Sequence, residues 1–346
     1  MARSQRVTLR DVADRLGLSV NTVSRALAGK DQVSEDTRAL VSAEAKRLGY
    51  VPNSHARSLV SGRTMVVGLV ITNPSNPFYA ALISAVERQC RAGGYSVLLL
   101  VTEDSADNEE RAVQELLRFG VDGVLGVATE SSSDVWDALR EAGIPVVQLS
   151  RDIPGRGLDF VGIDVESAIR DAIVRVAPPG VRRIWLLEED LRVSTVAARI
   201  AGFRRALDDL GVAHEHSLVL KVPTRRTSGA SLPWSPDDAY ALAANVITPG
   251  NHPDLVVTAN DYVALGVYRA IRECGLSVPD DVRVLGYGDH PFAAYLQPAL
   301  TTIRLPADEV GTAGVDLLLR RMADPDRPRT STRLPAELVE RQSTGR

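Results

Sequence analysis

The sequence predicts an all-α helix-turn-helix head followed by an α/β body of two lobes, with parallel sheets and helices on both faces. Three observations predict this fold class. Short amphipathic helices separated by small-residue turns fill the first fifty residues. From Met65 onward, apolar runs alternate with helical patterns in two series of similar length. The chain has 346 residues, which is too long for one ordinary domain and suits two or three.

The composition is typical of a soluble globular protein, since 45% of the residues are hydrophobic and 24% are charged. The chain has no unbroken apolar stretch of eighteen residues and no basic-then-apolar start. We therefore expect neither membrane insertion nor secretion, and predict a cytoplasmic protein. Cys90 and Cys274 lie far apart in helix-like patterns, so two reduced, part-buried thiols are expected.

The charge is unevenly distributed along the chain. Residues 1 to 63 hold eleven Lys and Arg against six Asp and Glu, a net +5, whereas the remainder holds 29 against 38, a net -9. A basic head on an acidic body is typical of a nucleic-acid-binding domain joined to another module. Because a chance excess of surface arginine would give the same numbers, the helix pattern has to be considered with the charge.

Residues 7 to 30, "VTLRDVADRLGLSVNTVSRALAGK", predict two short helices joined by a tight turn at Gly17. Thr8 is expected to cap the first helix and Ser19 the second. A third helix is expected to start after Ser34 and to end at Gly49, a residue free to adopt positive φ.

In a helix-turn-helix unit the second helix enters the major groove, and its first turn reaches the base edges. Val20 and Asn21 occupy that turn here, and Arg25 follows one turn later. Asn can pair with adenine and Arg with guanine. Hydroxyl side chains suit phosphates, and the predicted DNA-binding set therefore includes Thr8, Ser19, Thr22, Ser24, Ser34 and Thr37. A three-helix bundle that binds another protein is the alternative.

The body alternates apolar runs with helices, the first of them expected near residues 78–92, 109–119 and 135–142. The first series of runs is "MVVGLVI", "SVLLLV", "DGVLGV" and "IPVVQLS"; the second is "FVGI", "RIWLLE", "SLVLKV", "DLVVTA" and "VRVLGY". Fully apolar strands spaced by helices imply parallel sheets covered on both faces. In such sheets ligands bind beyond the carboxyl ends of the strands, so the residues after each strand are candidates for a site.

The head resembles the amino-terminal signature of the LacI/GalR family of bacterial transcriptional regulators, through "TVSRAL", "VSEDTR", "LGYVPN" and "ARSL". The motifs "TNPSNPF", "ARIAGF", "AND", "VPDDVRVLGYGD" and "PALTTIRLP" resemble the family's ligand-binding body, which is similar to periplasmic sugar-binding proteins. The resemblance covers nearly the whole chain and is weakest around 175 to 235. It implies a homodimeric repressor on a pseudo-palindromic operator, controlled by a sugar or a sugar-derived effector between the lobes.

The resemblance also implies domain boundaries. A helix-turn-helix domain would span 1–51, a hinge helix 52–63 and the body 64–346. Lobe 1 would comprise about 64–163 and 293–325, and lobe 2 about 164–292 and 326–340. In this family the hinge helix orders on operator DNA and enters the minor groove, which would involve Asn53, Ala56, Arg57 and a wedging Leu59. Leu59→Ala should then weaken operator binding and leave effector binding intact; a plain linker is the alternative.

Matching motifs place effector-binding residues at Asn73, Phe78, Arg199, Trp234, Asn260 and Asp261. The resemblance adds Ser150, which stands where the family commonly has Asp, Arg151, which keeps the family's usual following Arg, and Asp289, the next carboxylate after Gly288. Arg199 could make a forked contact to hydroxyls or a carboxylate, and Trp234 offers a flat apolar face. The alternatives are a structural salt bridge for Arg199, a helix cap for Asp261 and loop packing for Trp234.

Three positions depart from the family's pattern. Ser150 and Gly288 stand where the family commonly has Asp, and Ala28 stands where it often has Asn. Since the two carboxylates often bind sugar hydroxyls, their absence leaves room for an acidic or modified ligand.

An enzyme on a doubly wound body, with a head that binds another protein, is the main alternative function. The sequence has no Walker-type loop, no GxSxG, no GxGxxG after the first strand and no metal-ligand spacing. Its five histidines are scattered at His55, His214, His216, His252 and His290. We therefore predict no catalytic residue, cofactor or metal. A secreted solute receptor is disfavoured by the basic head, and the end "LVERQSTGR" lacks a heptad tail, which favours a dimer.

Overall fold

The computed structural model describes residues 7–27, 33–50, 62–129, 134–153, 155–224 and 234–345. The chain divides into two compact units, Met1–Thr64 and Met65–Arg346, which are called the head and the body below. No helix within these described ranges is long and apolar enough to cross a membrane.

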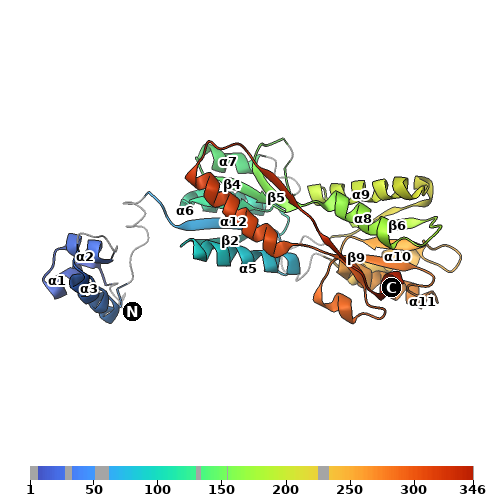
Figure 1. Cartoon of the computed structure of the whole chain (residues 1–346), viewed down its shortest axis with the longest axis horizontal. Coiled ribbons are helices and arrows are strands. Elements are labelled where there is room, and N and C mark those ends of the chain that lie inside the picture. Colours follow the sequence, from blue (N-terminus) through green and yellow to red (C-terminus); the bar gives the residue numbers. More distant parts are fainter. Residues whose placement is uncertain are drawn as a thin grey trace. The chain divides into compact units, whose positions relative to one another are not determined.

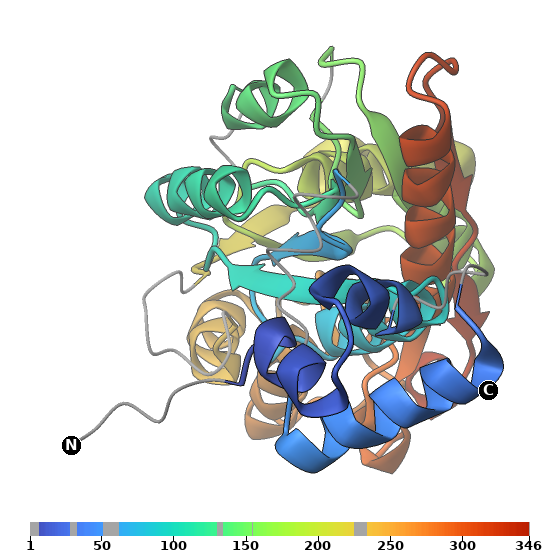
Figure 2. The ribbon, with the colours of Figure 1, turned by 90° about the vertical axis from the view of Figure 1, so that its left-hand side faces the viewer.

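Within its described residues the head has three helices, of which α3 is the longest (Figure 2). They are α1 (Leu9–Leu16), α2 (Val20–Leu27) and α3 (Glu35–Leu48). Their shared core is made of small and β-branched side chains, which let short helices pack closely: Val12, Ala13, Val23, Ala26, Val41 and Ala45. Gly17 and Gly49 end α1 and α3 in the left-handed conformation, as the sequence predicts.

The first lobe of the body is built on a six-stranded sheet in the order β11-β5-β4-β3-β1-β2, with every neighbouring pair parallel (Figure 1). Its strands are β1 (Val66–Ile71), β2 (Ser96–Val101), β3 (Gly123–Gly126), β4 (Val146–Leu149), β5 (Asp159–Ile163) and β11 (Ser331–Leu334). Its helices are α5 (Pro77–Ala92), α6 (Ala106–Phe119), α7 (Val135–Glu141) and α12 (Ala307–Ala323). Strand β1 is buried on both faces, because Leu69 packs with α5 and α12 whereas Val70 packs with α6 and α7.

The second lobe has a similar sheet in the order β12-β10-β9-β8-β6-β7, parallel except that β12 runs antiparallel to β10. Its strands are β6 (Ile184–Glu189), β7 (Val219–Val222), β8 (Leu255–Thr258), β9 (Arg283–Gly288), β10 (Thr301–Arg304) and β12 (Glu337–Val339). Its helices are α8 (Val165–Val176), α9 (Ser194–Leu210), α10 (Pro236–Val246) and α11 (Asp261–Glu273). Both faces are again covered, since Leu186 joins the cluster that contains α8 and α9, and Leu187 joins that of α10 and α11.

The chain passes between the lobes three times: after β5, after β10 and after β11. In Figure 1 the red carboxyl-terminal segment runs from α12 of the first lobe to β12 of the second. Two predictions about the lobes were wrong. Residues 301–304 belong to the second lobe, because β10 pairs with β9, and residues 331–334 belong to the first, because β11 pairs with β5. The run "FVGI", which the sequence analysis grouped with the second series of strands, forms β5 of the first sheet, between β4 and β11.

Candidate functional site

Helix α2 of the head presents the side chains that the sequence assigns to DNA. Val23 and Ala26 are buried against the other helices, so the opposite face is open to solvent. On that face Asn21, Ser24 and Arg25 are exposed, and Val20 is 41% exposed. The exposed face therefore carries a donor-acceptor amide and a guanidinium that are free to reach base edges.

The hydroxyl side chains of the head fix the beginnings of the helices. Thr8 and Asp11 form a reciprocal capping box, in which the backbone N–H of each residue donates to the side chain of the other at 2.7 and 3.3 Å. The backbone N–H and the hydroxyl of Thr8 both donate to the Asp11 carboxylate and lower the pKa of that carboxyl. The other two helices start with hydroxyl pairs, Ser19 with Thr22 and Ser34 with Thr37, each 2.8 Å apart between oxygens. The predicted contacts of Asn53, Ala56, Arg57 and Leu59 lie outside the described residues, as does Ala28.

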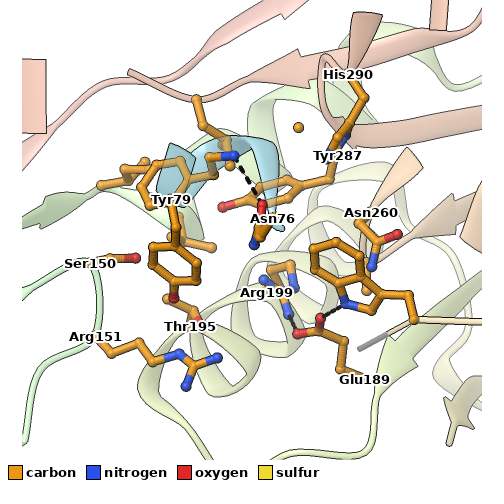
Figure 3. A pocket seen from close by; sticks show the side chains of 17 residues that line it. Asn76, Tyr79, Ser150, Arg151, Glu189, Thr195, Arg199, Asn260, Tyr287 and His290 are labelled. Carbon is orange, nitrogen blue, oxygen red and sulfur yellow. Dashed lines mark hydrogen bonds and ion pairs between the residues drawn. The ribbon is translucent and has the colours of Figure 1, made fainter. Parts of the chain in front are cut away.

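A cavity of about 80 Å³ lies between the two lobes of the body (Figure 3). From the first lobe its wall includes Asn76, Phe78, Tyr79, Ser150 and Arg151. From the second lobe it includes Glu189, Thr195, Arg199, Trp234, Asn260, Tyr287, Gly288 and His290. These residues come from strand ends and helix starts of both sheets, which is where open parallel sheets bind ligands. This cavity is called the cleft below.

Six of the nine residues predicted to bind the effector line the cleft: Phe78, Ser150, Arg151, Arg199, Trp234 and Asn260. The other three, Asn73, Asp261 and Asp289, do not, and each is engaged elsewhere. The Oδ1 of Asn73 accepts the backbone N–H of Ser75 at 2.8 Å, and Asn76, the cap of α5, lines the cleft in its place.

Asp261 is completely buried beneath the wall of the cleft. Its Oδ1 accepts the hydroxyl of Thr302 at 2.6 Å, and its Oδ2 accepts the backbone N–H of His290 at 2.7 Å. The cap of α11 is Asn260, whose Oδ1 accepts the N–H of Val263 at 3.0 Å. Asp261, which was predicted to contact the effector, does not line the cleft. It instead supports the wall of the cleft through its hydrogen bonds to Thr302 and His290.

Asp289 points toward two arginines. Its carboxylate accepts from Arg304 Nε at 2.8 Å and from Arg341 Nη2 at 2.6 Å. The residue has a positive φ of 48°, which turns the chain at the end of β9. The prediction that Asp289 serves as a carboxylate of the cleft was therefore wrong.

Arg199 is held by two carboxylates that the sequence analysis missed. Its Nε and Nη2 donate to both oxygens of Glu188 at 2.9 and 2.7 Å, and Nη2 also donates to Glu189 at 2.8 Å. The second oxygen of Glu189 accepts the indole N–H of Trp234 (Figure 3). Two consecutive glutamates at the end of the apolar strand "RIWLLEE" were the available signal.

Burial of this cluster shifts the pKa values of its members. Desolvation raises the pKa of Glu188 although the Arg199 guanidinium opposes that shift. For Arg199, burial alone would lower the pKa, but the carboxylates of Glu188 and Glu189 hold it above its ordinary value. Arg199 thus both lines the cleft and forms the structural salt bridge that the sequence left open as an alternative.

Arg151 is paired in the same way in the first lobe. Its Nη1 donates to the carboxylate of Asp104 and to the carbonyl oxygen of Ala128, the latter at 3.3 Å. Both side chains of the ion pair are buried. Each guanidinium of the cleft therefore already has a carboxylate partner within the protein.

The imidazole of His290 also lines the cleft, which the sequence analysis did not predict. It occupies the space beside Gly288, where a Cβ would lie 2.4 Å from the ring carbon Cε1. The space that a side chain at position 288 would occupy is thus filled by the ring of His290. Gly288 is one of the positions that depart from the family's pattern. Across the ranges that the structure describes, no group of three or more His, Cys, Asp or Glu could hold a metal ion.

Comparison with known proteins agrees with this geometry. A family model for bacterial regulatory proteins of the lacI family matches residues 8–53, and one for a periplasmic binding protein-like domain matches 176–344. The ribose operon repressor of Escherichia coli (strain K12) is 31% identical over 345 residues, covering 97% of this chain and 99% of that protein. This chain belongs to the LacI family of bacterial regulatory proteins. It is a DNA-binding transcriptional repressor controlled by a small-molecule effector.

Solved structures of this LacI-family fold include the lac repressor dimer bound to operator and the anti-inducer ONPF. That chain is 26% identical, with a TM-score of 0.86 and coverage of 98% of this chain and 99% of that one. The complex of the transcriptional regulator CelR with cellobiose is 29% identical, with a TM-score of 0.70 and coverage of 98% and 100%. The relatives compared are transcriptional regulators rather than enzymes.

Proposed function

We propose that the effector of this repressor is an uncharged, polyhydroxylated molecule, a sugar or a sugar-derived metabolite, that binds in the cleft. The observation that carries the proposal is the clamp on Arg199, whose guanidinium is bound by Glu188 and Glu189. A ligand carboxylate or phosphate would approach two glutamates and would find no guanidinium of the cleft without a carboxylate partner, as far as the described residues go. The acidic ligand considered from the sequence is therefore not favoured.

Two aromatic side chains support a sugar ring in the cleft. Phe78 from the first lobe and Trp234 from the second both line it, and aromatic faces pack well on the C–H faces of a pyranose or furanose. The ribose operon repressor and the CelR–cellobiose complex are named for sugars, which supports the same ligand class here.

For the head we propose that α2 enters the major groove, with Asn21 and Arg25 at the base edges. A homodimer would place two heads on a pseudo-palindromic operator, because two-fold symmetry in the protein is mirrored in the half-sites. The dimeric, operator-bound lac repressor supports this arrangement. We further propose that the protein is cytoplasmic, has no catalytic activity, and uses Asn53, Ala56, Arg57 and Leu59 as a hinge helix in the minor groove.

Control of DNA binding would follow from the position of the cleft. Both lobes contribute to its wall, so a bound effector changes the free energy of their closure. If closure of the lobes changes the affinity of the heads for the operator, effector binding and operator binding are coupled. By linkage, the effector and the operator then change each other's affinity by the same factor.

The ligand class can be tested with a matched series titrated calorimetrically into the full-length protein. D-ribose, D-ribonate and D-ribose 5-phosphate share a carbon skeleton and differ in charge; D-glucose with D-gluconate, and cellobiose, extend the series. The neutral sugars should bind at least about tenfold more tightly than their acidic partners, since burying an unpaired anion beside glutamates is costly. Tighter binding of an acid or a phosphate would overturn the proposal.

A further inference from the structure

We propose that His290 is a specificity-determining residue of the cleft, whose Nε2 accepts a hydrogen bond from an effector hydroxyl. The inference rests on the proposed function, because it concerns the same cleft and the same ligand class. Neither the sequence motifs nor the resemblance assigned His290 to ligand binding.

The orientation of the His290 ring is set by Asp261. The backbone N–H of His290 donates to Asp261 Oδ2 at 2.7 Å, and Nδ1 lies 3.1 Å from the same oxygen. The hydroxyl of Thr302 holds the other carboxylate oxygen at 2.6 Å. Because a carboxylate only accepts hydrogen bonds, Nδ1 carries the proton, and in the neutral ring Nε2 is left as an acceptor.

The position of the ring is set by packing. Phe292 stacks on it with centroids 5.8 Å apart, and Tyr262 and Trp234 meet it edge-on at 5.0 and 6.3 Å. On the remaining side lies Gly288, where an added Cβ would come within 2.4 Å of Cε1 and 2.5 Å of Nδ1. The imidazole fits only because position 288 has no side chain. His290 as a whole is 5% exposed.

Two buried polar atoms on this wall are unsatisfied. His290 Nε2 and Asn260 Nδ2 have no hydrogen-bond partner in the described part of the chain, although both residues line the cleft. The Oδ1 of Asn260 is committed to capping α11, so the amide nitrogen is the atom left over. Both residues are more than nine-tenths buried, and buried polar atoms are rarely left without partners. Their partner is therefore expected to be the ligand.

The pair offers one acceptor and one donor on the second-lobe side of the cleft, where Figure 3 shows Asn260 and His290 with Tyr287. A hydroxyl group both donates and accepts, so hydroxyls satisfy Nε2 and Nδ2 together. A carboxylate or a phosphate dianion cannot donate to Nε2, and a deoxygenated carbon would leave both atoms unpaired. The geometry thus selects for a hydroxylated carbon at this position of the effector.

Two substitutions separate ligand recognition from structural support. His290→Asn keeps a donor near Nδ1 for Asp261 but ends before the position of Nε2. His290→Gln places a polar group near Nε2 but gives up the Nδ1 position. The probes are D-ribose, D-glucose, D-xylose and cellobiose, titrated into wild type and both variants of the full-length protein, with melting temperature and sugar-free operator binding as controls.

We expect His290→Asn to melt close to wild type and to bind operator normally, yet to bind the sugar about 10- to 100-fold more weakly. His290→Gln should lose less affinity than His290→Asn. Sugar affinity of His290→Asn within about threefold of wild type, or an equal loss in both variants, overturns the role of Nε2 and leaves the proposed function standing.

If His290→Asn does not fold, His290→Ser replaces it, because its short side chain also ends before the position of Nε2. A loss of about tenfold or more in His290→Ser with a smaller loss in His290→Gln supports the proposal, and equal affinities of the two variants contradict it. Failure of all four sugars to bind the wild-type protein would instead refute the sugar class, and this inference with it.

Discussion

The head and the cleft use their polar side chains in opposite ways. In the head, Asn21 and Arg25 stand exposed on one short helix, and the hydroxyls near them are satisfied by capping within three residues. In the cleft, Arg199 and its two glutamates are buried and satisfy one another across two elements of the second lobe, β6 and α9. The head therefore offers polar groups freely to a partner, whereas the cleft leaves few atoms for its ligand, which is a basis for selectivity.

The same contrast appears in the carboxyl groups. Hydrogen bonds from Thr8 lower the pKa of exposed Asp11 in the head. In the body, burial raises the pKa of Glu109 to about 7, although Thr129 donates to it from its backbone N–H and its hydroxyl, both at 2.9 Å. Charge is therefore readily carried at the surface of the head and costly in the interior of the body.

The largest effect that follows from this comparison is expected for Arg199→Leu. The substitution leaves Glu188 and Glu189 buried without their cation, so the free energy of unfolding should fall by about 3–5 kcal/mol. Urea unfolding of the full chain, followed by tryptophan fluorescence at neutral pH, measures it. Arg88→Leu is the matched control, because its partner Asp308 forms an exposed ion pair, worth at most about 1 kcal/mol. Equal losses in the free energy of unfolding of the two variants would contradict the prediction that the buried ion pairs of Arg199 matter more for stability than the exposed pair of Arg88.

A smaller effect, on function alone, is expected in the head. Asn21→Ala and Arg25→Ala should each weaken binding to the operator by about 1–3 kcal/mol, since each would lose its proposed contact to a base edge. Neither should change the melting temperature appreciably, because both side chains are exposed. Fluorescence anisotropy on DNA from the upstream region of the gene measures the affinity. Leu40→Ala, which changes an exposed uncharged side chain on α3, is the control. An equal loss of operator affinity in this variant would contradict the proposal that α2 contacts the bases.

A third effect, spread over several pH units, concerns the carboxyl group of Glu109. Because the folded pKa of Glu109 lies above its ordinary value of 4.5, the folded state binds the proton more tightly, and stability falls as pH rises from about 4.5 through 7. Between pH 5 and pH 8, the free energy of unfolding of the wild-type body should fall by roughly 1–3 kcal/mol more than that of the Glu109→Gln variant. The contribution of Asp11 to stability has the opposite pH dependence. Because its folded pKa is lowered, the contribution is present above pH 3.8 and is lost as the pH falls below that value. Urea unfolding at both pH values checks this, and parallel curves for the two proteins would contradict it.

The head could be predicted from the sequence because its signals are local. Thr8, Ser19 and Ser34 each precede a helix, and Gly17 and Gly49 each follow one, so caps and turns lie within a few residues of what they determine. In the body, the long apolar strands were equally clear. The short strands β10 and β11 were placed in the wrong lobes, because "TTIR" and "STRL" carry no sign of which sheet they join.

Residues of the cleft wall could be predicted only in part, through motifs that match the family's pattern. Trp234, Phe78 and Asn260 were placed correctly on its wall. Asp289 and His290 are adjacent, yet the turn sends the carboxylate to Arg304 and the imidazole to the cleft. That choice depends on the space left beside Gly288 and on the buried carboxylate of Asp261, which are tertiary features that one sequence does not reveal.

Coupling between effector binding and operator binding is tested most directly by a reciprocal titration of the full-length protein with operator DNA and a neutral sugar, using D-ribose first. Operator affinity is measured with and without the sugar, and sugar affinity with and without the operator. Both affinities should change by the same factor, about 5- to 150-fold, with no such change for D-ribose 5-phosphate. Operator affinity that ignores the neutral sugars but responds to the phosphorylated or acidic ones would contradict it.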